Sequence, residues 1–101
     1  MSRWAAIVTL AVILVGCNLG SPDEDATGEE IYAQLCARCH GADLGGGVGP
    51  DIGPSSNAAA EDDEYLEFTV LNGRGRMPSF SSLDAEQVDR LVDYMREVQG
   101  E

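Results

Sequence analysis

Apolar positions along the chain form three stretches with helical spacing, separated by long segments that show no period. The first stretch begins after Thr27, which forms a capping box with Glu30 three residues later. One face of the predicted helix carries the apolar side chains of Ile31, Tyr32 and Leu35. We therefore predict a helix that begins at Thr27 and runs directly into residues 36–40.

A second helix is predicted over residues 61–71. Its first turn is acidic, as the helix dipole favours, and Gly73 is placed to end it. We expect three side chains to mark its buried side: Tyr65, Phe68 and Leu71. The flanking segments, residues 41–60 and 73–82, contain many glycines and lack periodicity, so we predict long loops. A loop as long as the first is usually functional or wrapped around something.

The last helix has the clearest signals. Asp84 caps it, Gln87 stands at the third helical position, and Leu83 is placed to pack onto Val88. Apolar residues recur at helical spacing, with charged residues opposite: Val88, Leu91, Val92, Met95 and Val98. No strand pattern and no internal repeat is visible, so we predict an all-α domain with about three main helices and long loops.

The first residues have the pattern of an export signal. A short positive region at Arg3 precedes the apolar residues 4–15, which fall short of the ~20 that a membrane-spanning helix needs. The following LVGC resembles the lipobox of bacterial lipoproteins, so we expect removal of residues 1–16 and lipidation of Cys17. Residues 17–26 then form a flexible acidic tether, and residues 27–101 the domain. The alternative is an ordinary signal peptide or an uncleaved anchor, with Cys17 left as a thiol.

The mature chain of 85 residues is long enough for one domain with a thin hydrophobic core. A domain of this size usually needs additional stabilisation, and a disulfide between Cys36 and Cys39 would close too small a loop to provide it. A buried cofactor is therefore favoured. The net charge of −12 becomes −13 without Arg3, and no lysine is present. Such a surface argues against nucleic acid and anionic lipid headgroups as partners. It suits either basic protein partners or a saline medium.

The stretch CARCH places two cysteines and the only histidine of the chain within five residues. Dithiol redox motifs accompany a βαβ pattern, which is lacking, and a structural zinc site needs about four ligands from Cys and His clusters. The remaining chemistry is covalent haem attachment. In it, Cys36 and Cys39 form thioethers to the porphyrin and His40 becomes an axial ligand of the iron. We therefore predict one c-type haem.

The iron has a second axial position, and no other histidine is available for it. Met1 leaves with the signal, and Met95 lies in the apolar stripe of the last helix, where methionine is most often core. Met77 follows a glycine-rich segment 37 residues after His40, enough chain to reach the far face of the haem. We predict Met77 as the distal ligand. The alternative is a loop methionine that packs on the domain.

The stretches CARCHGADLGGGVGPDIG and NGRGRMPSF resemble the bacterial class I cytochromes c, small monohaem electron carriers, over residues 27–98. The resemblance implies crossing N-terminal and C-terminal helices, with loops wrapped around one covalent haem. It also implies that the carbonyl of Pro50 accepts a hydrogen bond from the haem histidine and fixes its tautomer. Arg74 and Arg76 either pair with the haem propionates or face solvent. The lysines that often surround the haem edge in mitochondrial members are absent.

We expect an electron carrier and no enzyme, because His40 is committed to the iron and nothing else resembles a catalytic site. A monomer, tethered by lipid on the periplasmic or outer side of a membrane, would shuttle single electrons between membrane-associated complexes. Partners would be a quinol-oxidising complex or a terminal oxidase with basic docking surfaces. Two alternatives remain. One is a haem enzyme or sensor, peroxidase or gas-binding, with a labile Met77; the other is a permanently docked haem subunit of an oxidase or dehydrogenase.

Overall fold

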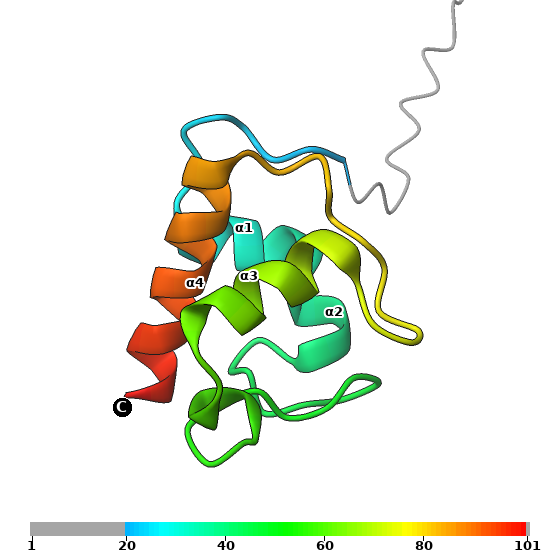
Figure 1. Cartoon of the computed structure of the whole chain (residues 1–101), viewed down its shortest axis with the longest axis vertical. Helices are drawn as coiled ribbons and strands as arrows, with labels where there is room; N and C mark the ends of the chain where they lie inside the picture. The colour runs from blue at the N-terminus through cyan, green and yellow to red at the C-terminus, as the bar shows by residue number, and fades with distance from the viewer. Residues whose placement is uncertain (1–19, 101) are drawn as a thin grey trace, which may run out of the picture.

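The structure is a computed structural model that describes residues 20–100. In chain order the elements are α1 (Gly28–Leu35), α2 (Ala37–His40), the 3₁₀ helix η1 (Ala58–Ala60), α3 (Asp63–Asn72) and α4 (Ala85–Gln99). The described residues form no strand and only one isolated bridge, between Arg74 and Met77. The predicted all-α class with long loops is confirmed (Figure 1).

The predicted start of the first helix is confirmed. Thr27 is its N-cap, and the reciprocal hydrogen bonds between Thr27 and Glu30 are both 3.1 Å long. The helix does not run unbroken into residues 36–40, however. Cys36 is the C-cap of α1 and the N-cap of α2, so the two helices are separate segments that meet at this cysteine.

The second helix begins two residues later than predicted, because Asp62 caps it by accepting a hydrogen bond of 2.8 Å from the Tyr65 amide. Gly73 ends it as predicted. The prediction that Phe68 is buried is wrong: this side chain is 64% exposed. The buried residues of α3 are Leu66 and Val70, one turn apart, and Phe68 is rotated by roughly 200° from Leu66 around the helix.

The last helix agrees most closely with its prediction. Asp84 and Gln87 form the capping box, with hydrogen bonds of 2.8 and 2.9 Å. Leu83 is buried together with most of the predicted apolar stripe, namely Val88, Leu91, Val92 and Met95. Val98 is partly buried against them. These side chains form the hydrophobic core of the domain together with the buried apolar side chains of α1 and α3.

The crossing of α1 and α4 depends on the absence of a side chain at Gly28. A β-carbon there would lie 2.0 Å from the carbonyl oxygen of Arg90 and 2.9 Å from the β-carbon of Tyr94. The close approach brings the rings of Tyr32 and Tyr94 to a centroid distance of 5.6 Å, tilted by 53°. α3 packs on the same long helix, so α4 contacts both other main helices (Figure 1).

Residues 20–26 lie on the domain in the structure, which differs from the flexible tether predicted for residues 17–26. Pro22 and Ala26 are buried. Arg90 of α4 donates hydrogen bonds to the carbonyls of Ala26 and Glu24, at 2.9 and 2.7 Å. The predicted signal and Cys17 lie outside the described residues. Within residues 20–100, no helix combines the length and the apolar character required to cross a membrane.

Candidate haem site

His40, at the end of α2, is held by the loop that follows it. Its Nδ1 atom lies 2.8 Å from the carbonyl oxygen of Pro50. A carbonyl can only accept a hydrogen bond, so this contact requires the proton on Nδ1 and leaves the lone pair of Nε2 free. Glycine at position 49 permits the approach, because a β-carbon there would lie 3.1 Å from Cε1 of His40.

The two cysteines of the motif are free thiols in the structure. Cys36 is buried at the junction of α1 and α2, and Cys39 is half-buried one turn later. Burial, with a smaller contribution from nearby Cys39, raises the pKa of the Cys36 thiol to about 12. The Cys36 sulfur is therefore neutral at physiological pH, and its environment suits an uncharged species such as a thioether.

Met77 lies on a tight reversal after α3. The backbone of Arg74 and Met77 forms two hydrogen bonds, of 2.9 and 3.2 Å, which close the turn. Gly73 enters this turn with a φ of +73°, and a β-carbon there would lie 2.5 Å from the Met77 carbonyl oxygen. The glycine therefore allows the Met77 segment to pass close to the end of α3.

Two adjoining cavities, of about 780 and 420 Å³, lie between these segments. Both volumes fall within the roughly 300–1,000 Å³ of small-molecule sites. His40, Pro50, Arg74 and Met77 line both cavities. The smaller cavity brings together the four side chains predicted to attach the haem or to ligate its iron: Cys36, Cys39, His40 and Met77. This set of donors, two thiols beside a histidine with a free Nε2 and a methionine sulfur, fits a covalently attached haem.

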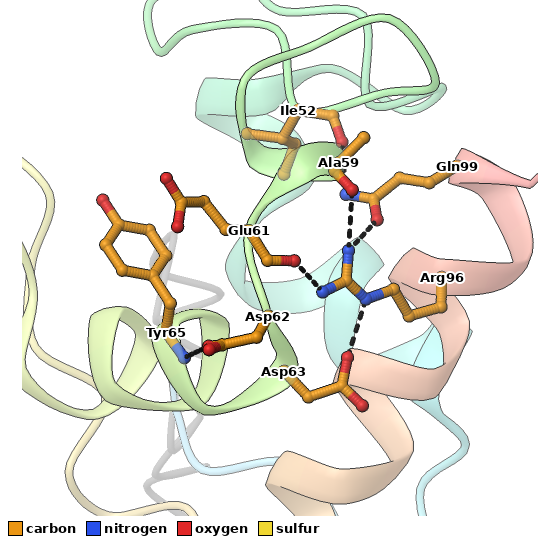
Figure 2. Close-up of polar contacts among 8 residues, drawn as sticks. All are labelled: Ile52, Ala59, Glu61, Asp62, Asp63, Tyr65, Arg96 and Gln99. Atoms are coloured by element: carbon orange, nitrogen blue, oxygen red, sulfur yellow. Dashed lines mark hydrogen bonds and ion pairs between the residues drawn. The ribbon is translucent and has the colours of Figure 1, made fainter.

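Arg96 of α4 makes polar contacts with residues 59–63 (Figure 2), and the neighbouring Ile52, Ala58 and Glu61 line the larger cavity. The Arg96 guanidinium group donates to the Asp63 carboxylate at 2.7 Å, to the Glu61 carbonyl at 2.5 Å and, more weakly, to the Ala59 carbonyl at 3.4 Å. It also bonds the side chain of Gln99 at 2.7 Å. Since Gln99 in turn donates to the carbonyl of Ile52, these contacts tie residues 52–63 to α4.

Arg74 and Arg76 occupy different positions at the site. Arg74 lines both cavities and donates a short hydrogen bond to the hydroxyl of Tyr65. Arg76 is exposed and lines only the smaller cavity, as does Arg38. Sequence reasoning missed Arg38, although its position between the two cysteines was a usable signal. It also missed Arg96, whose partners come from distant segments and leave no local pattern.

Known proteins match most of the chain. The family model described as cytochrome C oxidase, cbb3-type, subunit III, matches residues 23–95. Cytochrome c-551 of Bacillus subtilis (strain 168) is 35% identical over 81 residues, which cover 68% of this chain and 70% of that protein. The solved structure of the c-type cytochrome NirC is 36% identical with a TM-score of 0.60, covering 69% of this chain and 85% of the other.

Some relatives are much longer proteins. The quinohemoprotein alcohol dehydrogenase ADH IIB of Pseudomonas putida is 35% identical over 80 residues, which are 74% of this chain but 11% of that enzyme. The relatives as a group are mainly electron-carrier cytochromes c, and some are parts of dehydrogenases. Their shared cofactor is haem c, bound covalently and containing iron. The chain belongs to the cytochrome c family and is a small class I monohaem cytochrome c, an electron-transfer protein that carries haem c.

Proposed function

We propose that the chain is a carrier of single electrons whose haem is held by four side chains. Cys36 and Cys39 form the thioethers, His40 provides the proximal axial nitrogen, and Met77 provides the distal sulfur. The haem iron supplies the one-electron redox couple when bound. The observation that carries the proposal is that all four side chains line one cavity. The carbonyl of Pro50 keeps His40 in the tautomer that leaves Nε2 free, which supports the same role.

The ligand assignment is tested by absorption spectra of the oxidised and reduced protein, wild type beside Met77→Ala. We expect a weak far-red ferric band that is present in the wild type and lost in the variant. Met95→Leu is the matched control, because Met95 also lines the larger cavity but lies in the core of α4. A far-red band that survives Met77→Ala and disappears in Met95→Leu would contradict the assignment.

We further propose that the carrier works at the cell envelope. Members of the family are exported or associated with membranes. The LVGC stretch supports removal of residues 1–16 and lipidation of Cys17, with the lipid on the periplasmic or outer side of the membrane. Mass measurement of the purified mature protein tests this, because a lipidated N-terminus adds acyl mass that Cys17→Ser removes. An unmodified chain starting elsewhere would contradict the lipid anchor.

The partners that we propose are membrane-associated redox proteins, with electrons passing between a donor such as a quinol-oxidising complex or dehydrogenase and an acceptor such as a terminal oxidase. The net charge of −13 expected for the mature chain favours long-range attraction to basic surfaces.

The likeness to a segment of a quinohemoprotein dehydrogenase favours a second candidate function, that of a haem subunit docked permanently to an enzyme. Purification at high salt separates the two possibilities, since a free shuttle would elute alone and a docked subunit with its enzyme.

A further inference from the structure

The end of α3 carries a chemically labile pair of residues. Asn72 is the last residue of the helix and Gly73 is its C-cap. Asparagine is thermolabile, most of all before glycine, because glycine has no side chain to hinder attack by its own amide nitrogen on the asparagine side chain. Of the three asparagines in the sequence, only Asn72 precedes a glycine, whereas Asn57 precedes an alanine. Asn72 is also exposed, so water reaches its side chain.

The fold requires the glycine of this pair. The φ of Gly73 is +73°, and a β-carbon there would lie 2.5 Å from the carbonyl oxygen of Met77 and 2.9 Å from the carbonyl carbon of Pro78. A larger residue at this position would hinder attack on Asn72, but the close contacts and the positive φ exclude it. The turn that holds Met77 is therefore built on the residue that makes its neighbour labile.

The folded helix keeps the two reacting groups engaged elsewhere. The Gly73 N–H donates to the Thr69 carbonyl at 2.8 Å, and Nδ2 of Asn72 donates to the Phe68 carbonyl at 2.9 Å. For the reaction, the Gly73 nitrogen must turn towards Cγ of Asn72, which breaks the first hydrogen bond. The departing side-chain nitrogen must give up the second. The last turn of α3 therefore has to open first, and helix ends are among the parts of a fold that open most readily.

The Met77 segment is attached to this same turn. Ser79 Oγ donates to the Leu71 carbonyl at 2.5 Å. The Phe80 amide donates to the Val70 carbonyl at 2.9 Å. A longer backbone at the asparagine would disturb these bonds, because the glycine that follows it has no free space towards the Met77 carbonyl. A carboxylate at the same position would also be unfavourable, since it would lie at the negative end of the helix dipole.

We propose that Asn72 is a site of spontaneous deamidation, reached when the last turn of α3 opens, and that the product destabilises the turn that holds Met77. The Gly73 nitrogen loses its proton and bonds to Cγ of Asn72, while the side-chain nitrogen takes up a proton and leaves as ammonia. Water then opens the five-membered succinimide at either carbonyl, which gives aspartate or isoaspartate. Isoaspartate carries the additional methylene in the main chain. This chemistry needs only solvent water and does not require Met77 to ligate the iron.

The test incubates the mature holoprotein at mildly alkaline pH and follows the peptide that contains residue 72 by mass spectrometry. Replacement of the amide nitrogen by oxygen raises its mass, and enzymatic methylation of the isoaspartyl carboxylate identifies the second product. Asn72→Gln removes the labile pair, and Asn57 is the internal control. Ser79→Ala loosens the turn by removing the hydrogen bond to Leu71. Ser81→Ala, at an exposed serine, is its matched control.

We expect the native protein to gain mass at Asn72 and not at Asn57, about tenfold more slowly than the same protein unfolded in urea, because the turn must open first. Asn72→Gln should stay unmodified. Ser79→Ala should react about threefold faster than Ser81→Ala. A native protein that stays unmodified while the unfolded chain converts fully would overturn the proposed site. Equal rates in the two serine variants would overturn the opening of the last turn.

The effect of the product is measured separately. Anion exchange separates the modified protein, which carries one more negative charge, and urea unfolding gives its midpoint beside that of the unmodified protein. Asn72→Asp introduces the charge without lengthening the backbone. We expect the isoaspartate form to unfold at a lower urea concentration than both the unmodified protein and Asn72→Asp. If it unfolds at the same concentration as the unmodified protein, the proposed destabilisation of the Met77 turn is wrong.

Discussion

Substitution of Arg96 by methionine removes four polar contacts while keeping most of the length of the side chain (Figure 2). The Arg96 side chain is 27% exposed and that of Asp63 is 62% exposed, so the ion pair contributes at most about 1 kcal/mol after screening. The remaining hydrogen bonds, to the Glu61 carbonyl, the Gln99 side chain and more weakly the Ala59 carbonyl, contribute on the order of 1 kcal/mol in all, because these partners have access to water. The expected loss is therefore about 2 kcal/mol of unfolding free energy.

For a domain of this size, that loss lowers Tm by roughly 10 °C. Denaturant unfolding of the ferric holoprotein, followed by far-UV circular dichroism, measures the free energy. The far-red ferric band, followed in the same titration, reports on the proposed Met77 ligand. Met77 lines the larger cavity together with Ile52, Ala58 and Glu61 from residues 52–61. We expect this band to be lost at lower denaturant in Arg96→Met.

Arg38→Met is the matched control, because this arginine is exposed and makes no polar contact within the described residues. Its unfolding free energy should stay within about 0.5 kcal/mol of the wild type. If Arg96→Met unfolds at the same denaturant concentration as Arg38→Met, the proposed role of Arg96 in fixing the cavity wall is wrong.

Two further predictions concern the turn before Met77 and the cap of α1. Gly73→Ala should weaken the far-red band and lower stability by more than about 1 kcal/mol, because the new β-carbon meets the Met77 carbonyl oxygen and a positive φ disfavours alanine. Gly75→Ala, with a φ of +59° and nothing within 4 Å, should lower stability while leaving the band intact. Hydrogen bonds from Thr27 lower the pKa of Glu30 from its ordinary value of 4.5. The ionised Glu30 carboxylate should therefore stabilise the folded protein above pH 4.5, and this contribution should be lost as the pH falls further. Urea unfolding at neutral and acid pH should thus show Glu30→Ala less stable than wild type only at the higher pH.

Each of these predictions has a contradicting result. If Gly73→Ala and Gly75→Ala lost the far-red band equally, the loss would result from the strained backbone conformation. The contact between the new β-carbon and the Met77 carbonyl oxygen would then not be its cause. For the cap, the control is Glu29→Ala, a neighbouring carboxylate of the same turn outside the capping box. A stability difference between wild type and Glu30→Ala that persists unchanged into acid would rule out the ionised carboxylate as its source.

The helix ends were predictable where the signal is local. Thr27 and Glu30, like Asp84 and Gln87, are three residues apart and bond to one another, so sequence spacing determines their contacts. The buried face of α3 was not predictable in the same way. Its apolar residues spread around the helix, and only packing against the core selects Leu66 and leaves Phe68 exposed.

The candidate site also has features that sequence spacing predicts and features that it does not. The haem-attachment motif is contiguous in the sequence, and its residues line one cavity with Met77. The hydrogen bond between Arg74 and Tyr65, and those that link Arg96 and Gln99 to residues 52–63, join segments distant in sequence. No spacing rule predicts them. The contacts of residues 20–26 with α4 were not predicted for a further reason. The acidic composition of this segment, with glycine and proline, indicates a flexible linker. Composition does not reveal that Arg90 donates hydrogen bonds to its backbone carbonyls.

The central proposal is that His40 and Met77 together fill both axial positions of the haem iron, as expected of an electron carrier that binds no further ligand. Exposure of the reduced protein to carbon monoxide at neutral pH tests this most directly, with Met77→Ala as the positive control. We predict that the wild-type spectrum stays unchanged, while the variant binds carbon monoxide and its spectrum shifts. Ready binding by the wild type would contradict the claim and favour a ligand-binding haem enzyme or sensor.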